Sequence, residues 1–98
     1  MRAVRTPGEA GRDEALVAFA HEGCSEARSW GNGPGDSYGR HDHPRAKVLF
    51  CLEGSIVIHT DEGDVMLVAG ERLDLPADTP HAATVGTSGC SCVEAWGP

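Results

Sequence analysis

The close spacing of turn-forming residues constrains the fold more than any other feature of this sequence. From Cys24 to the end of the chain, short apolar runs alternate with clusters of Gly, Pro, Asn and Asp. The chain has 13 Gly and 6 Pro, which supply the backbone conformations that tight turns need. The runs between these clusters are too short for helices of ordinary length, so the pattern predicts about eight short strands.

The expected strands are marked by apolar content and by the turns at their ends. Ala46 to Leu52 is the clearest strand, and Asp61 to Asp64 forms a hairpin turn between strands at 56–58 and 65–68. Further strands are expected at 26–30, 38–43, 73–75, 82–85 and 90–96. So many short strands with close turns predict an all-β closed barrel or sandwich, and closure into a barrel removes exposed strand edges.

The chain divides into an N-terminal segment, 1–23, and a β domain, 24–98. Residues 6–23 have a helical pattern, and Thr6 to Glu9 has the form of a capping box with Pro7 in the first turn. Gly8 and Gly11 weaken the beginning of this pattern, so a short N-terminal helix starting near Arg12 is the alternative.

Charge and cysteine usage limit the classes of partner. The formal net charge is −7, which disfavours nucleic acid as a partner, and the sequence predicts no membrane segment or signal peptide. A cytoplasmic location with reduced thiols is therefore expected. Cys90 and Cys92 face the same side if they lie on a strand. They are either a soft ligand pair or, as we expect, small apolar residues of the core.

His41 and His43 are the strongest local candidate for chemistry. Residues two apart on an extended segment face the same side, so the two imidazoles are spaced to share one metal ion. Imidazole is a common ligand for transition metals. The competing interpretation is that both histidines lie in a surface loop and that His81 only caps a strand.

Two wider spacing patterns surround these histidines. In the first, fixed intervals of five, one, three and six residues separate Gly35, His41, His43, Lys47 and Gly54. In the second, intervals of five, one and two residues separate Gly70, Pro76, Asp78 and His81. Together they resemble the two sequence motifs of the cupin family, over residues 24–96.

Three positions depart from the family pattern. Asp78 stands where the family has Gly, and Asp tolerates a left-handed backbone better than most residues. Val85 stands where the family has Asn and removes one polar group. Lys47 stands where the family has a metal-binding Glu. An ammonium group has no lone pair for a metal and repels a cation.

The resemblance implies a jelly-roll β-barrel that holds one divalent transition metal through His41, His43 and His81. Fe, Zn, Ni, Cu and Mn all remain candidates. Some cupins work with three histidines and no Glu, thiol dioxygenases among them, whereas others have lost the metal and only bind ligands. Many cupins are homodimers, and the small size of this chain also favours association.

Two functions from different classes follow from these expectations. The first is an enzyme, such as a dioxygenase, isomerase or lyase, that acts on a small anionic substrate held by Lys47. The second is a non-catalytic small-ligand binding or sensing barrel. An enzyme needs a group near the metal that moves protons. Tyr38 is expected to face away from His41 if its strand is regular.

The Lys47 side chain is expected to point into the barrel, where a buried ammonium needs compensation. Either an internal acid pairs with it, Glu53, Asp74 or Glu94 being the candidates, or its stem crosses the barrel and its head reaches the mouth. The second arrangement is favoured, because it leaves the ammonium group free for an anionic ligand.

Overall fold

Two long strands form the centre of the fold in the computed structural model, which describes residues 2–98. Strand β4 (Lys47–Thr60) and strand β7 (His81–Trp96) pair antiparallel along almost their whole length. The prediction of separate short strands is therefore wrong at two places. The expected strands at 46–52 and 56–58 are both parts of β4, and those at 82–85 and 90–96 are both parts of β7. Register shifts within the β4–β7 ladder take the place of the expected breaks.

Gly54 explains why β4 can continue past the expected break. Its φ is +71°, and a Cβ atom built there would lie 1.9 Å from the carbonyl oxygen of Gly89 on β7. Only glycine allows both this backbone conformation and such a close approach of the two strands. The position that resembles a motif glycine thus has a direct structural reason.

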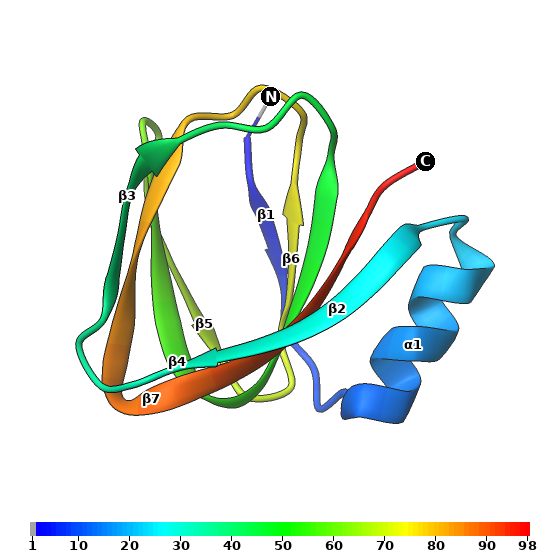
Figure 1. Cartoon of the computed structure of the whole chain (residues 1–98), viewed down its shortest axis with the longest axis horizontal. Coiled ribbons are helices and arrows are strands. Elements are labelled where there is room, and N and C mark those ends of the chain that lie inside the picture. The colour runs from blue at the N-terminus through cyan, green and yellow to red at the C-terminus, as the bar shows by residue number, and fades with distance from the viewer. Residues whose placement is uncertain (1) are drawn as a thin grey trace.

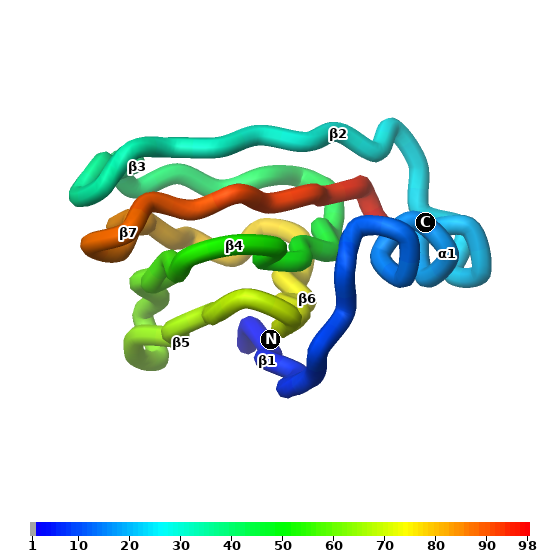
Figure 2. The backbone as a smooth tube through the Cα atoms, turned by 90° about the horizontal axis from the view of Figure 1, so that it is seen from below, coloured from blue at the N-terminus to red at the C-terminus, as the bar shows by residue number. Residues whose placement is uncertain are grey.

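The remaining strands extend the sheet on both sides of this central pair. They are β1 (Val4–Thr6), β2 (Ser25–Asn32), β3 (Ser37–His41), β5 (Gly63–Val68) and β6 (Arg72–Leu75). The strand order is β1-β6-β4-β7-β2, with β5 paired to β4 and β3 paired to β7. Figures 1 and 2 show the sheet curving over itself, with β2 and β3 opposite β1 and β5. The fold is the predicted all-β jelly-roll barrel with one short helix.

The N-terminal segment contributes both a strand and the helix. Thr6 ends β1, which pairs with β6, and the predicted capping box at Thr6 is therefore wrong. Helix α1 (Arg12–His21) begins six residues later, with Gly11 at the N-cap. The Gly11 amide donates to Glu14 Oε1 at 2.8 Å, so one of the free amides at the helix start has a partner.

Alternating side chains of β4 and β7 form two separate apolar clusters. Leu49, Cys51 and Cys92 point into the barrel, whereas Val48 and Phe50 point outward under α1. Because both faces of β4 are covered in this region, its sequence from Val48 to Leu52 is a continuous apolar run. The expectation that Cys90 and Cys92 pack in the core is confirmed, since the inner cluster contains both of them together with Cys51.

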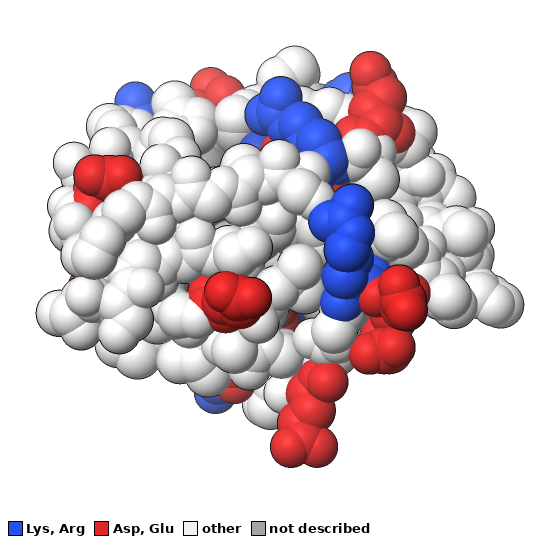
Figure 3. All heavy atoms as spheres, turned by 60° about the horizontal axis from the view of Figure 1, so that its bottom comes forward, with Lys and Arg blue, Asp and Glu red and all other residues white. Residues whose placement is uncertain are grey.

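Charged side chains lie mainly on the outer surface, and many of them are paired. On the face shown in Figure 3, Lys and Arg side chains lie next to Asp and Glu side chains on a mostly uncharged surface. Arg72 at the barrel wall, for example, binds Glu22 at the end of α1 and Asp74 on its own strand. In the part of the chain that the structure describes, no helix is long and apolar enough to cross a membrane.

Candidate metal centre

Three histidine side chains meet at one end of the barrel interior. The ring centroid of His41 lies 4.3 Å from that of His81 and 4.8 Å from that of His43, and the His43 and His81 centroids are 5.2 Å apart. One ring nitrogen from each residue lies within 4.8 Å of the others. Ligand nitrogens around one zinc ion are about 3.3 Å apart, so small side-chain rotations would bring these three to bonding distance.

Backbone carbonyl groups orient two of the three rings. His41 Nδ1 lies 2.7 Å from the oxygen of Gly39, and His81 Nδ1 lies 2.8 Å from the oxygen of Thr79. A carbonyl oxygen only accepts hydrogen bonds, so each Nδ1 carries the proton and each Nε2 keeps its lone pair. Metal-binding histidines in proteins are oriented by this kind of outer hydrogen bond. The donor set therefore fits a transition metal.

The pocket also keeps two of the rings neutral. Burial, together with the nearby Lys47 ammonium and the other histidines, lowers the pKa of His43. Burial likewise lowers the pKa of His81, although its hydrogen bond to Thr79 acts in the opposite direction. A neutral imidazole is the form that binds a metal, so these shifts favour the ligand form of both residues near pH 7.

The convergence of the histidines depends on the pairing of β3 with β7. His41 lies directly opposite His81 in this ladder, which places the two sequence motifs side by side. Strand β3 ends at His41, earlier than the predicted strand at 38–43, so His43 lies in the segment between β3 and β4. The loop before His81 is joined to this segment, because the Asp78 amide donates to the His43 carbonyl oxygen at 2.7 Å. Asp78 has a φ of +58°, which confirms the prediction that it adopts a left-handed backbone.

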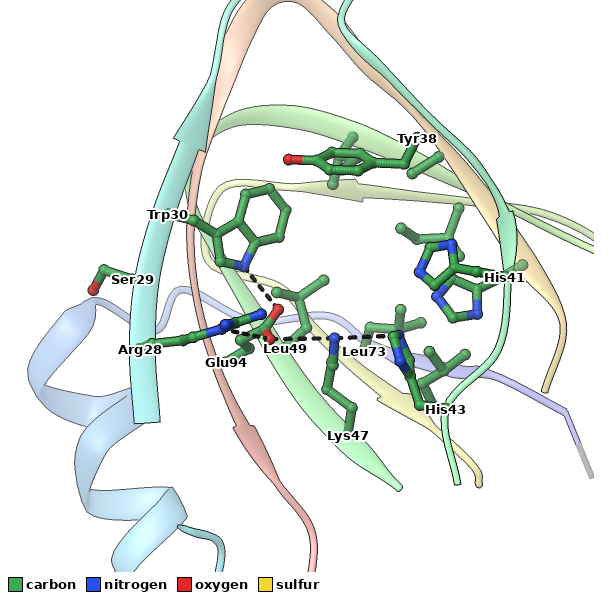
Figure 4. A pocket seen from close by; sticks show the side chains of 15 residues that line it. Arg28, Ser29, Trp30, Tyr38, His41, His43, Lys47, Leu49, Leu73 and Glu94 are labelled. Atoms are coloured by element: carbon green, nitrogen blue, oxygen red, sulfur yellow. Dashed lines mark hydrogen bonds and ion pairs between the residues drawn. The ribbon is translucent and has the colours of Figure 1, made fainter. Parts of the chain in front are cut away.

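Tyr38 faces the same pocket as His41, and the prediction that it faces away is wrong. The β3–β7 register shifts between Tyr38 and His41, so three steps on β3 correspond to two steps on β7. Such a bulge reverses the alternation of side chains along the strand. The Tyr38 hydroxyl donates to Asn32 Oδ1 at 2.5 Å, and in Figure 4 it points toward Trp30.

Lys47 points into the barrel, as predicted, but its head is not free. Its Nζ lies 3.2 Å from Glu94 Oε2 and 3.5 Å from His43 Nε2, and 4.9 Å from the centre of the Trp96 ring. The favoured alternative of an unpaired ammonium at the mouth is therefore wrong. The physical reason is burial: the Lys47 side chain is only 13% exposed, so a nearby anion is needed to offset the cost of desolvation.

Glu94 is the central polar residue of this pocket, and the sequence identified it only as one of three candidate acids. Its side chain is 7% exposed, and it accepts hydrogen bonds from Trp30 Nε1 at 2.7 Å and Arg28 Nε at 3.3 Å. Arg28 and Trp30, both on β2, were not predicted at all. The sequence offered one signal for this group: Glu94 lies inside the apolar run at 92–96. A charge buried there would be costly without a partner, which indicates that a cation lies nearby.

The histidines and this polar group line one cavity of about 440 Å³, within the range of small-molecule sites. In Figure 4, Arg28, Glu94, Lys47 and His43 form a row joined by ion pairs and hydrogen bonds. Apolar side chains of the barrel interior line the rest of the cavity: Leu49, Ile56, Ile58, Leu73, Leu75 and Ala83. The cavity therefore has a polar row along one wall and an apolar lining elsewhere.

The fold and this cluster define a class of protein: small antiparallel jelly-roll barrels whose interior pocket carries three histidines from two motifs. A family model described as the Cupin domain matches residues 32–94 of the chain. The chain belongs to the cupin family, as its two motifs suggest. No curated protein matches the chain.

Solved structures support the same fold. The chain is similar to an RmlC-like cupin from Shewanella frigidimarina NCIMB 400, with 22% identity over 74% of this chain and 64% of that one, and a TM-score of 0.65. It is similar to KdgF from Halomonas sp., with 18% identity, coverage of 74% and 68%, and a TM-score of 0.65. At these identities the likeness shows the fold alone.

A third similar structure comes from a study of the DMSP lyases RdDddP and RnDddQII. The identity is 30%, the match covers 74% of this chain, and the TM-score is 0.63. The match covers only 36% of that protein. The Shewanella protein is also longer than the region matched, since the chain spans slightly less than two thirds of it.

Proposed function

We propose that this protein binds one divalent transition metal through His41, His43 and His81 and acts as an enzyme on a small anionic molecule. The observation that carries the proposal is the convergence of three imidazoles on one cavity. In two of them, His41 and His81, Nδ1 donates a hydrogen bond to a backbone carbonyl, which leaves the lone pair of Nε2 available for a metal. Three imidazoles suit several first-row metals, so the chemistry of the donor set does not select one of them.

The open coordination positions support a catalytic role. A metal held by three protein ligands supplies a Lewis acid with positions left for substrate or water. Tyr38 lines the same pocket as His41. Its hydroxyl points toward Trp30, away from the histidines, so it is placed to exchange a proton with the end of a bound ligand that lies farther from the metal. This residue favours the enzyme over the alternative, a barrel that only binds or senses its ligand.

Charge within the pocket supports an anionic ligand. Arg28 and Lys47 are positive and Glu94 is negative, so this row of side chains carries a net charge of +1 before any metal is bound. The chain as a whole has a net charge of −7. A pocket of opposite sign to the rest of the protein concentrates small anions and holds them more strongly where water is excluded. Lys47 contributes to this field next to His43.

Metal content of untagged protein tests the proposal most directly. Wild type should contain close to one equivalent of a transition metal by elemental analysis. His81→Ala should lose most of it, because two ligands from one short segment rarely hold an ion alone. His59→Ala is the matched control, since His59 binds Asp64 and Thr84 outside the cluster. Equal metal content in wild type and the His41, His43 and His81 triple alanine variant would contradict the proposed site.

We also propose that the protein is a homodimer. Apolar side chains on β1 and β5 are exposed, among them Val4, Met66 and Val68, and covering such residues would add apolar burial to a small core. Sedimentation equilibrium should give about twice the chain mass of 10.3 kDa. A mass that stays at that of one chain across the concentration range would contradict the dimer.

A further inference from the structure

Arg28 is the pocket cation that remains most accessible to a ligand. Its side chain is 70% exposed, whereas that of Lys47 is 13% exposed. Among the described residues, only Glu94 binds the Arg28 guanidinium, through Nε at 3.3 Å. The two terminal nitrogens therefore have no protein partner in this part of the chain, and the bond to Glu94 restrains the orientation of the group.

Lys47 has less capacity for a new partner. Glu94, His43 and the Trp96 ring surround its ammonium group. A ligand that bound Lys47 directly would have to compete with these contacts, whereas a ligand that bound Arg28 would add to them. The guanidinium is also the better match in shape, because two parallel N–H groups pair with the two oxygens of a carboxylate.

The two ends of the cavity offer different chemistry. Arg28 projects from β2, and Figure 4 shows it on the other side of the pocket from His41 and His43. Between these ends lie the Trp30 and Tyr38 rings, whose centroids are 6.0 Å apart, and the apolar side chains of Leu49 and Leu73. Glu94 and Lys47 line one wall between the same two ends, but they are paired with each other. A ligand that reaches from one end to the other therefore needs an apolar middle on the side that faces the two rings and the leucines.

We propose that Arg28 binds a carboxylate of the substrate at the end of the pocket opposite the histidines. The substrate is then a short carboxylic acid with an apolar body whose other end carries an oxygen that reaches the histidine cluster. This inference rests on the proposed function for its second half. The contact with Arg28 does not require the metal and is tested separately.

The test compares hexanoate with hexanamide, which has the same length and shape but no charge, in titrations of metal-free protein by calorimetry. Wild type should bind hexanoate about tenfold more tightly, the value of one exposed charge-assisted interaction. Arg28→Gln should lose this preference, and Arg28→Lys should retain part of it. Arg12→Gln is the matched control, because Arg12 binds Ser29 rather than lining the pocket.

The same variants separate this inference from the proposed metal site. Metal content should be the same in Arg28→Gln and wild type, while adipate, which has a carboxylate at each end, should bind more tightly to metal-loaded than to metal-free wild type. If neither wild type nor any variant binds metal but Arg28→Gln still loses the preference for hexanoate, the proposed metal site is contradicted and the proposed role of Arg28 is supported. An unchanged preference in Arg28→Gln, or no carboxylate binding at millimolar concentration in wild type, would overturn the anchor.

Discussion

Replacing Glu94 with Gln removes the only negative charge of the row that joins Arg28 to His43. The amide keeps an oxygen that accepts the Trp30 hydrogen bond, and its size is nearly unchanged, so the substitution mainly removes charge. Lys47 would then be an ammonium group with a 13% exposed side chain, near a histidine and an indole ring but without an anion. This change isolates the contribution of the buried ion pair.

The expected loss of stability is about 3 kcal/mol, at the lower end of the range for removing one partner of a buried ion pair. The Lys47–Glu94 pair has little solvent screening, because both side chains are mostly buried. Arg28 adds at most about 1 kcal/mol, since it is largely exposed. The remaining contact of Lys47 with Trp96 keeps the loss from being larger.

Urea denaturation followed by tryptophan fluorescence measures this effect, with Glu26→Gln as control. Glu26 also pairs with an arginine, but its side chain is 68% exposed, and its replacement should cost no more than about 1 kcal/mol. Adding Lys47→Met to Glu94→Gln should recover about 2 kcal/mol, because the stranded ammonium is removed. A Glu94→Gln loss no larger than that of Glu26→Gln, or no recovery in the double variant, would refute the reasoning.

Three further outcomes follow from the structure. Stability of the metal-free protein should fall as pH decreases below about 6.5, because His43 and His81 have lowered pKa values and the unfolded chain binds protons first; denaturation of His43→Gln across the same pH range should give a shallower slope. Gly54→Ala should cost at least about 2 kcal/mol, since a Cβ there meets the Gly89 oxygen in a left-handed backbone, and Gly39→Ala, which meets no atom within 4 Å, serves as the control; equal losses would contradict this. A transition metal at about 100 times its dissociation constant should stabilise wild type by about 2.7 kcal/mol and His81→Ala much less, which thermal denaturation with and without metal would measure; equal shifts in both proteins would argue against the site.

Much of the fold class and the candidate site follows from patterns that are local in the chain. The alternation of short apolar runs and turn residues is enough to predict a β-barrel, because side-chain alternation and turn conformation depend on neighbouring residues. The spacing of His41 and His43 predicts that they point together, and the resemblance of the motifs to cupins adds His81. The left-handed backbone at Asp78 is also a local property, and the structure confirms it.

The partners of these residues depend on the tertiary structure. Tyr38 faces the pocket because of a bulge that exists only in the pairing of β3 with β7. The Lys47–Glu94 ion pair joins residues far apart in the chain, and Arg28 reaches Glu94 only because β2 pairs with β7 beside it. Strand register and bulges are set by the partner strand and the packing of the core. No local pattern contains that information, so the sequence by itself predicted the histidines, while the tertiary structure decided what surrounds them.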